Sequence, residues 1–78
     1  MRRNYRVVVN MTSEITGEIA AQIELGVSQA PCVSAAITAA VYVVDHAADE
    51  MGLEDVSISS LSIFPLLDSE PVPDFSLN

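Results

Sequence analysis

The feature that most constrains this chain is a run of apolar residues at helical spacing in its middle. Seven residues recur three or four positions apart, as on one face of an α-helix: Val33, Ile37, Ala40, Val41, Val44, Ala48 and Met51. Pro31 suits the first position of such a helix, because its φ is already helical and its missing amide hydrogen is not needed there. Gly52 follows, and glycine readily adopts the left-handed conformation that ends many helices. The sequence therefore predicts a helix over residues 31–51.

This helix is apolar over more of its circumference than one small sheet can cover. Between residues 31 and 44 its only polar side chains are Ser34, Thr38 and Tyr42, four apart along one strip. A helix of this kind is buried on more than one side. We therefore expect its outward face to pack on a second copy or on another protein; the alternative is that exposed alanines need no partner. The residues expected on this face are Cys32, Ala36, Ala39 and Val43.

Alternation of apolar and polar residues predicts two strands before the helix, joined by a hairpin loop at residues 12–14. The first strand covers residues 5–11, where three successive valines favour extended backbone. The second covers residues 15–25, where apolar residues occupy the odd positions. Ile15, Ile19 and Ile23 are also four apart, so an amphipathic helix with Ser13 as its N-cap is an alternative for this segment. We prefer the strand because Leu25 also keeps the alternation.

A third strand is predicted after the helix, with a change of phase inside it. Val56 and Ile58 stand at even positions, whereas Leu61 and Ile63 stand at odd positions. A β-bulge near residues 59–60 would return both pairs to one face. Residues 65–78 hold further prolines and three acids, which predicts an acidic C-terminal tail after a domain of residues 1–64.

Together these elements predict an α+β fold of ββαβ order, in which the long helix packs on one face of a three-stranded antiparallel sheet. The strand residues expected in the core are Tyr5, Val7, Val9, Ile19, Ile23, Val56 and Ile58. The opposite face is expected to show Arg6, Asn10, Thr16, Glu18, Gln22 and several serines. A domain of 78 residues buries only about 60% of the surface that its unfolded chain exposes, so we expect a partner chain to add stability.

Charge is segregated along the chain and argues against two classes of function. Eleven acids and three arginines, the latter all within the first six residues, give a net charge of −8, and there is no lysine. Phosphate backbones and anionic membranes attract Lys and Arg, so direct binding to nucleic acid or to a membrane is not expected.

Five acids surround the predicted end of the helix: Asp45, Asp49, Glu50, Glu54 and Asp55. Negative charge at a helix C-terminus opposes the helix dipole. A basic surface on a partner protein would explain these acids, and they are the predicted partner-binding residues. The alternative is a solvated acidic surface in a generally acidic chain.

The sequence contains few residues suited to catalysis or metal binding. The chain has one His, one Cys and no glycine-rich phosphate loop. His46 and the acids three and four residues on could hold a divalent metal, but a surface histidine is the preferred interpretation. Cys32 could be activated by free amides at the helix start, although a packed, inert thiol is preferred. We therefore expect a protein that is not an enzyme and has no cofactor.

The expected location is cytoplasmic. A single cysteine favours a reducing compartment, and the three-valine run near the N-terminus is too short for a signal-peptide core. Residues 25–44 carry no charge and are long enough to span a bilayer, but several polar residues and many alanines make insertion unfavourable.

The layout of an amphipathic hairpin, a Pro-started alanine-rich helix and a final strand resembles several small phage-encoded proteins, including anti-CRISPR proteins. The resemblance covers residues 5–64 in architecture only and transfers no functional residue. It implies a non-catalytic inhibitor that covers a basic surface of a larger nucleic-acid-binding complex. Three hypotheses follow: a protein-binding module of this kind, a subunit that self-assembles through its helix, and a small enzyme or metal binder centred on His46.

Overall fold

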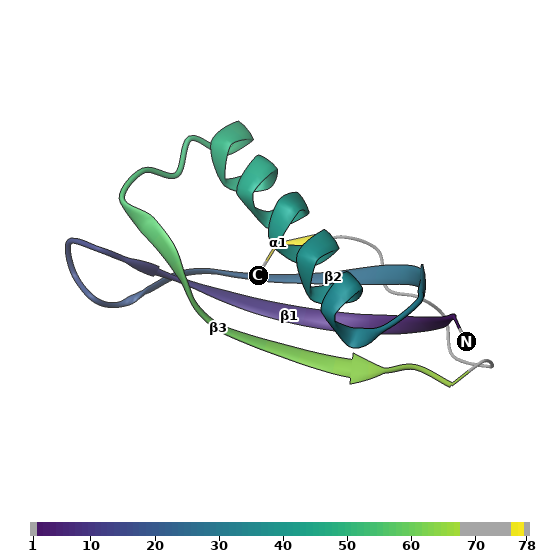
Figure 1. Ribbon diagram of the computed structural model, residues 1–78. Coiled ribbons are helices and arrows are strands. Elements are labelled where there is room, and N and C mark those ends of the chain that lie inside the picture. Colours follow the sequence, from purple (N-terminus) through teal and green to yellow (C-terminus); the bar gives the residue numbers. More distant parts are fainter. Residues whose placement is uncertain (1, 68–75, 78) are drawn as a thin grey trace.

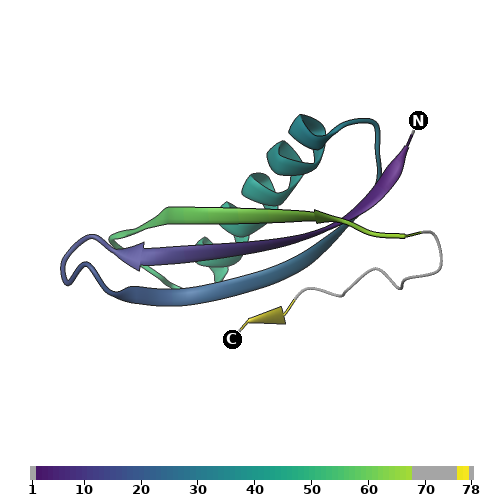
Figure 2. The same ribbon diagram turned by 90° about the horizontal axis from the view of Figure 1, so that it is seen from below.

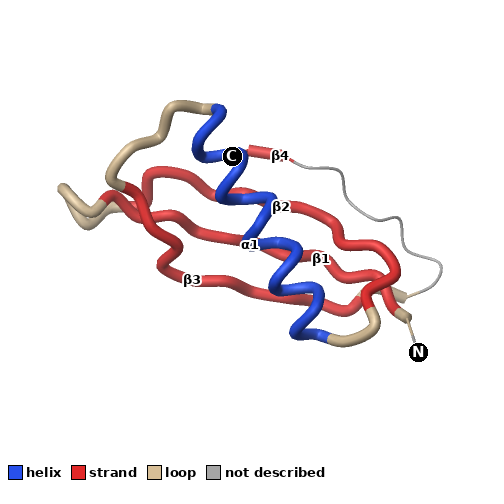
Figure 3. Tube along the Cα trace, turned by 45° about the horizontal axis from the view of Figure 1, so that its top comes forward, coloured by secondary structure: helices blue, strands red, loops and turns tan. Residues whose placement is uncertain are grey.

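The computed structural model describes residues 2–67 and 76–77. Its elements are β1 (Arg3–Ser13), β2 (Ile19–Ala30), α1 (Val33–Glu50), β3 (Val56–Pro65) and β4 (Ser76–Leu77). The strands form one antiparallel sheet in the order β3-β1-β2-β4, and α1 lies across one face of it (Figures 1 and 3). The predicted ββαβ arrangement is confirmed. Two residues of the predicted tail add the short strand β4, whereas residues 68–75 and 78 lie outside the described part.

The hairpin between β1 and β2 confirms the strand interpretation of the second segment, but only from Ile19 onward. Residues 14–18 form the turn, so the loop predicted at residues 12–14 was placed too early. Ser13 organises this turn: its Oγ accepts hydrogen bonds from the amides of Ile15 and Thr16, both at 3.2 Å. Gly17 takes a φ of 77°, a conformation that glycine adopts without steric cost.

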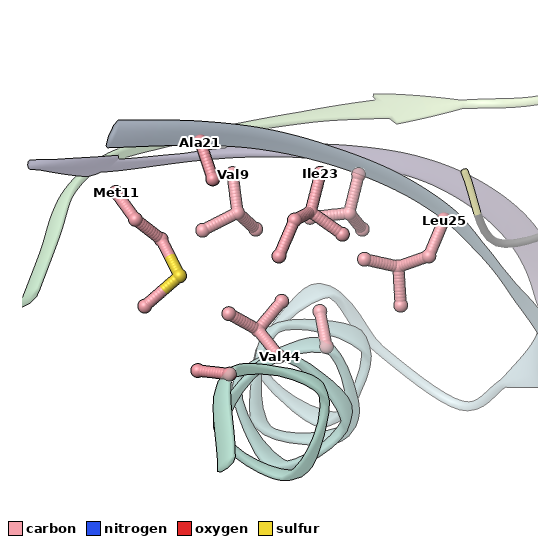
Figure 4. Packing of buried hydrophobic residues seen from close by; sticks show 9 residues of the cluster. Val9, Met11, Ala21, Ile23, Leu25 and Val44 are labelled. Atoms are coloured by element: carbon pink, nitrogen blue, oxygen red, sulfur yellow. The ribbon is translucent and has the colours of Figure 1, made fainter. Parts of the chain in front are cut away.

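The core lies between α1 and the inner face of β1 and β2. Val7, Val9, Ile23 and Val44 have no exposed surface, and Figure 4 shows Val9, Ile23 and Val44 pointing into the same layer. The prediction that Tyr5, Val7, Val9 and Ile23 lie in the core is therefore confirmed. Ile19 is 67% exposed, so its assignment to the core was wrong. Val56 and Ile58 pack against the core but are only partly buried.

The buried stripe of α1 is narrower than the predicted one. Its four buried residues are spaced four positions apart along the helix: Ala36, Ala40, Val44 and Ala48. Val33 and Met51, at the two ends of the predicted stripe, are 47% and 37% exposed. Three of the four buried residues are alanines, so the helix backbone can approach the sheet closely.

The helix begins at Val33 rather than at Pro31, because β2 continues to Ala30. Ala30 is buried against Tyr5 and Ala36, which holds the end of the strand under the helix. Just before it, Gln29 adopts a φ of 59°, and its carbonyl accepts a hydrogen bond of 2.9 Å from Arg2 Nη1. Pro31 therefore lies in the connection. At the other end, Gly52 has the predicted left-handed conformation, with a φ of 71°.

The predicted bulge in β3 is confirmed. Asn10 of β1 pairs with Ser60, whereas the next residue, Met11, pairs with Ile58, so Ser59 is the extra residue. The Oγ atom of Ser59 donates a hydrogen bond of 3.2 Å to the Asn10 carbonyl. This extra residue returns the apolar residues of both halves of β3 to the helix side of the sheet.

Among the described residues, no helix covers the other face of the sheet (Figure 2). The Asn10 side chain there links three strands, accepting a hydrogen bond of 3.0 Å from Gln22 and donating one of 2.9 Å to Ser60. Two rows along the same face, Arg6 Nη1 lies 3.6 Å from Glu24 Oε2, and Arg6 Cζ lies 4.7 Å from the centre of the Phe64 ring. The predicted polar face is thus correct for Arg6, Asn10 and Gln22. Thr16 and Glu18 belong instead to the hairpin turn.

Two isoleucines of β2 provide a matched test of this packing. Replacing Ile23, which is fully buried, by alanine should lower the free energy of unfolding by about 2–5 kcal/mol, because a cavity remains in the core. The same change at Ile19, 67% exposed, should alter it by less than about 0.5 kcal/mol. Urea unfolding followed by circular dichroism measures both. Equal losses at the two positions would contradict the described core.

Candidate functional site

Acidic residues of the hairpin turn, of the last turn of α1 and of the loop after α1 lie towards one end of the molecule. The molecule has extents of 41 × 20 × 19 Å. The hairpin turn and the loop after α1 lie at the end away from the N-terminus (Figure 1). They are joined by a hydrogen bond of 2.7 Å from the Glu14 amide to the Asp55 carbonyl. We call this surface the acidic end. Its acids, all exposed, are Glu14, Glu18, Asp49, Glu50, Glu54 and Asp55.

Two exposed isoleucines lie within the acidic end. Ile15 and Ile19, from the turn and the start of β2, are 78% and 67% exposed. The helix does not reach the hairpin turn, because its 18 residues extend about 27 Å while the 11 residues of β1 extend about 37 Å, so Ile15 is left exposed. Ile19 is exposed for a different reason. Met11 pairs with Ala21 but Thr12 pairs with Ile19, so Ala20 is an extra residue and Ile19 turns to the open face of the sheet, beside Asn10 and Gln22.

Four of the five predicted partner-binding residues belong to the acidic end: Asp49, Glu50, Glu54 and Asp55. Asp45 is also exposed but lies one turn earlier on α1. Sequence reasoning missed Glu14 and Glu18, because it placed no contact between the hairpin and the loop after the helix. It also missed Ile15 and Ile19 as surface residues. The position of the turn and the register shift at Ala20 depend on how the two strands pair, and no local pattern signals them.

A second exposed surface runs along the outward side of α1. A shallow hollow of about 570 Å³ is lined by Ser34, Ala35, Thr38, Ala39, Tyr42 and Val43, and we call it the helix hollow. Tyr42 is 65% exposed and Val43 39% exposed. The His46 ring stands edge-on to the Tyr42 ring, with 4.5 Å between their centres. An adjoining hollow of about 240 Å³ extends along the helix to Glu50.

Three of the four predicted interface residues lie on the surface of this helix region: Cys32, Ala39 and Val43 are exposed. Ala36 was placed there wrongly. It has no exposed surface and packs against Tyr5 and Ala30. The physical reason is its spacing of four from Ala40, which makes it the first residue of the buried stripe.

Cys32 is the N-cap of α1 and is exposed, so the expected packed thiol was wrong. Its Sγ lies 3.3 Å from the Ser34 Oγ. Hydrogen bonding from the Ser34 hydroxyl, with a further contribution from the Ala35 amide, lowers the pKa of the Cys32 thiol below its usual value. The one histidine of the sequence, His46, lies more than three turns along the helix from Cys32 and is therefore beyond hydrogen-bonding reach of the thiol.

The environment of Cys32 gives a pH-dependent prediction. Because a lowered pKa means more thiolate at a given pH, alkylation of the folded chain should reach half its maximal rate at a lower pH than alkylation of the urea-unfolded chain. Ser34→Ala should move the folded midpoint back towards the unfolded one. Iodoacetamide kinetics over a pH series measure both, and coincident midpoints for folded and unfolded chains would contradict the assignment.

Other chemical sites are not evident in the described part of the chain. Across residues 2–67 and 76–77, no three side chains of His, Cys, Asp or Glu are grouped closely enough to hold a metal ion. The uncharged stretch 25–44 is divided between β2 and α1. Within the same described ranges, no helix combines the length and the apolar character needed to cross a bilayer.

No protein-family model, curated protein or solved structure matches this chain.

Proposed function

We propose that this protein is a non-catalytic binding module that docks its acidic end on a basic surface of a larger protein. The observation that carries the proposal is that the hairpin turn and the loop after α1, which are hydrogen-bonded to each other, expose acids together with two isoleucines at the acidic end. The arginines are at the other end of the sheet: Arg3 pairs with Ala30 and Arg6 with Gly26, far from the hairpin turn. The acidic end therefore keeps its charge available to a partner.

The two kinds of side chain have different roles in such docking. Burying one isoleucine in a partner's pocket contributes about 1.5–3 kcal/mol, which is affinity that exposed carboxylates alone do not provide. The carboxylates supply long-range attraction, which speeds association with a basic surface and disfavours acidic partners. Apolar contacts at the centre with charges around them are the usual anatomy of a protein interface.

The negative charge at the C-terminal end of α1 does not stabilise the helix, which supports a role for these acids in binding a partner. The last turn of α1 contains no basic residue, and Asp49 and Glu50 oppose the helix dipole there. Within the described residues, the ion pair formed is the one between Arg6 and Glu24, away from this end. A basic partner would supply the compensating charge that the fold lacks.

An inhibitor is the form of this function that the chemistry suits most directly. Carboxylates spaced over an exposed surface can occupy a site that normally receives phosphates, so the module would cover the nucleic-acid-binding surface of its target. A cytoplasmic setting fits this form, because the exposed, unpaired Cys32 remains a thiol in a reducing compartment.

The test places a photoreactive amino acid at Ile15, within the acidic end, or at Ser62, on the open face of the sheet, and exposes each full-length chain to lysate of the source organism. We expect position 15 to capture a protein with a basic surface, and the capture to fall as salt rises from about 0.05 M to 0.5 M. For the inhibitor form, excess DNA should compete. Capture from position 62 alone would overturn the proposal.

Charge variants separate a docking site from the general effect of net charge. Glu14→Gln with Asp55→Asn changes the net charge by +2 at the acidic end, and Glu24→Gln with Ser62→Lys makes the same change on the open face. With the captured protein as ligand, the first pair should slow association at low salt by about tenfold and the second by much less. Asparagine tolerates the φ of 56° at position 55, so folding should be retained. Equal slowing by the two pairs would contradict a local docking site.

A further inference from the structure

We propose that the helix hollow is the interface of a two-fold symmetric homodimer in which the α1 helices of two copies pack antiparallel. The hollow combines a depression of about 570 Å³ with two exposed apolar side chains, Tyr42 and Val43. Its lining residues lie on the side of α1 opposite to the buried stripe, so a second copy can approach the hollow without disturbing the core. Figure 3 shows α1 crossing one face of the sheet.

In an antiparallel pair of helices, large side chains along the hollow of one copy lie opposite small side chains of the other. In an antiparallel pair with its axis between Thr38 and Ala39, residues whose numbers sum to 77 lie opposite each other. The six lining residues then face one another in three kinds of pair: Ser34 with Val43, Ala35 with Tyr42, and Thr38 with Ala39. In the first two pairs a large side chain meets a small one, so the Tyr42 ring of each copy enters the depression beside Ala35 of the other. Helices pack at short distances where such small residues lie between them.

Charge selects the antiparallel arrangement over the parallel one. The first turn of α1 has no acid and the last turn has no base. In an antiparallel pair of this register, Asp45 of each copy lies level with Cys32, the N-cap at the positive N-terminal end of the other helix. Arg2 stands near that end, bonded to the Gln29 carbonyl. A parallel pair would instead bring the acids of both copies together.

This dimer is compatible with the proposed docking function and does not depend on it. The antiparallel arrangement points the two hairpins in opposite directions, so Glu14, Ile15 and Glu18 of both copies stay accessible. Such an assembly presents two acidic ends to its partners. It also gives an 8.3 kDa chain the additional buried surface that a domain of this size needs.

Sedimentation equilibrium of the full-length chain at micromolar concentrations tests the proposal. We expect twice the chain mass of 8.3 kDa, and at least about a tenfold higher dissociation constant for Tyr42→Ala, because the aromatic residue that fills the hollow is lost. Phe64→Ala is the matched control: Phe64 is an aromatic residue 43% exposed on the other face of the sheet, and its loss should leave the dimer intact. A monomer at all concentrations, or equal weakening by both variants, would overturn the proposal.

Cross-linking tests the symmetry itself. In a Cys32→Ser background, Ala39→Cys places a thiol next to the proposed axis, and Ser62→Cys places one on the open face of the sheet. A short bismaleimide should join two copies through position 39 and not through position 62. Efficient dimer formation from position 62, or none from position 39 in a sample that sediments as a dimer, would contradict the antiparallel helix interface.

Discussion

The packing of small residues of α1 on the inner face of β1 and β2 is the interaction on which the rest of this structure depends. Alanines at positions 36, 40 and 48 let the helix backbone lie close to the sheet, and Val44 meets Val9 and Ile23 at the centre (Figure 4). Because so narrow a stripe anchors the helix, its larger apolar side chains Tyr42 and Val43 are left outside. The exposed helix hollow is thus a consequence of how the core is built.

The same packing explains the acidic end. The helix covers only part of the long β1–β2 hairpin, so Ile15 in the turn beyond it is exposed next to the acids of the turn. The register shift at Ala20 places Ile19 on the open face of the sheet, where it is exposed as well. The loop after α1 then returns to the hairpin through the Glu14–Asp55 hydrogen bond and adds its own carboxylates. The helix hollow is therefore apolar and nearly neutral, whereas the acidic end combines exposed isoleucines with many carboxylates.

Much of this fold follows from sequence periodicity, and the errors have identifiable causes. The alternation in 5–11, the helical spacing after Pro31 and the change of phase before Leu61 predicted the strands, the helix and the bulge at Ser59. Periodicity does not reveal a β-bulge in a strand whose apolar pattern continues unbroken, so the register shift at Ala20 was missed and Ile19 was assigned to the core. It also does not separate the faces of an alanine-rich helix, so Ala36 was assigned to the surface. The joining of Glu14 to the loop after α1 depends on tertiary structure, which no local pattern contains.

Carboxylate labelling in intact cells is the most direct measurement of whether the acidic end is a docking site. Carbodiimide labelling read by mass spectrometry compares each acid in the cell with the same acid in the purified chain. The account predicts that Glu14, Glu18, Glu54 and Asp55 are protected in cells, whereas Glu24 on the open sheet face is labelled equally in both. Equal labelling of all five carboxylates in the two samples would contradict it.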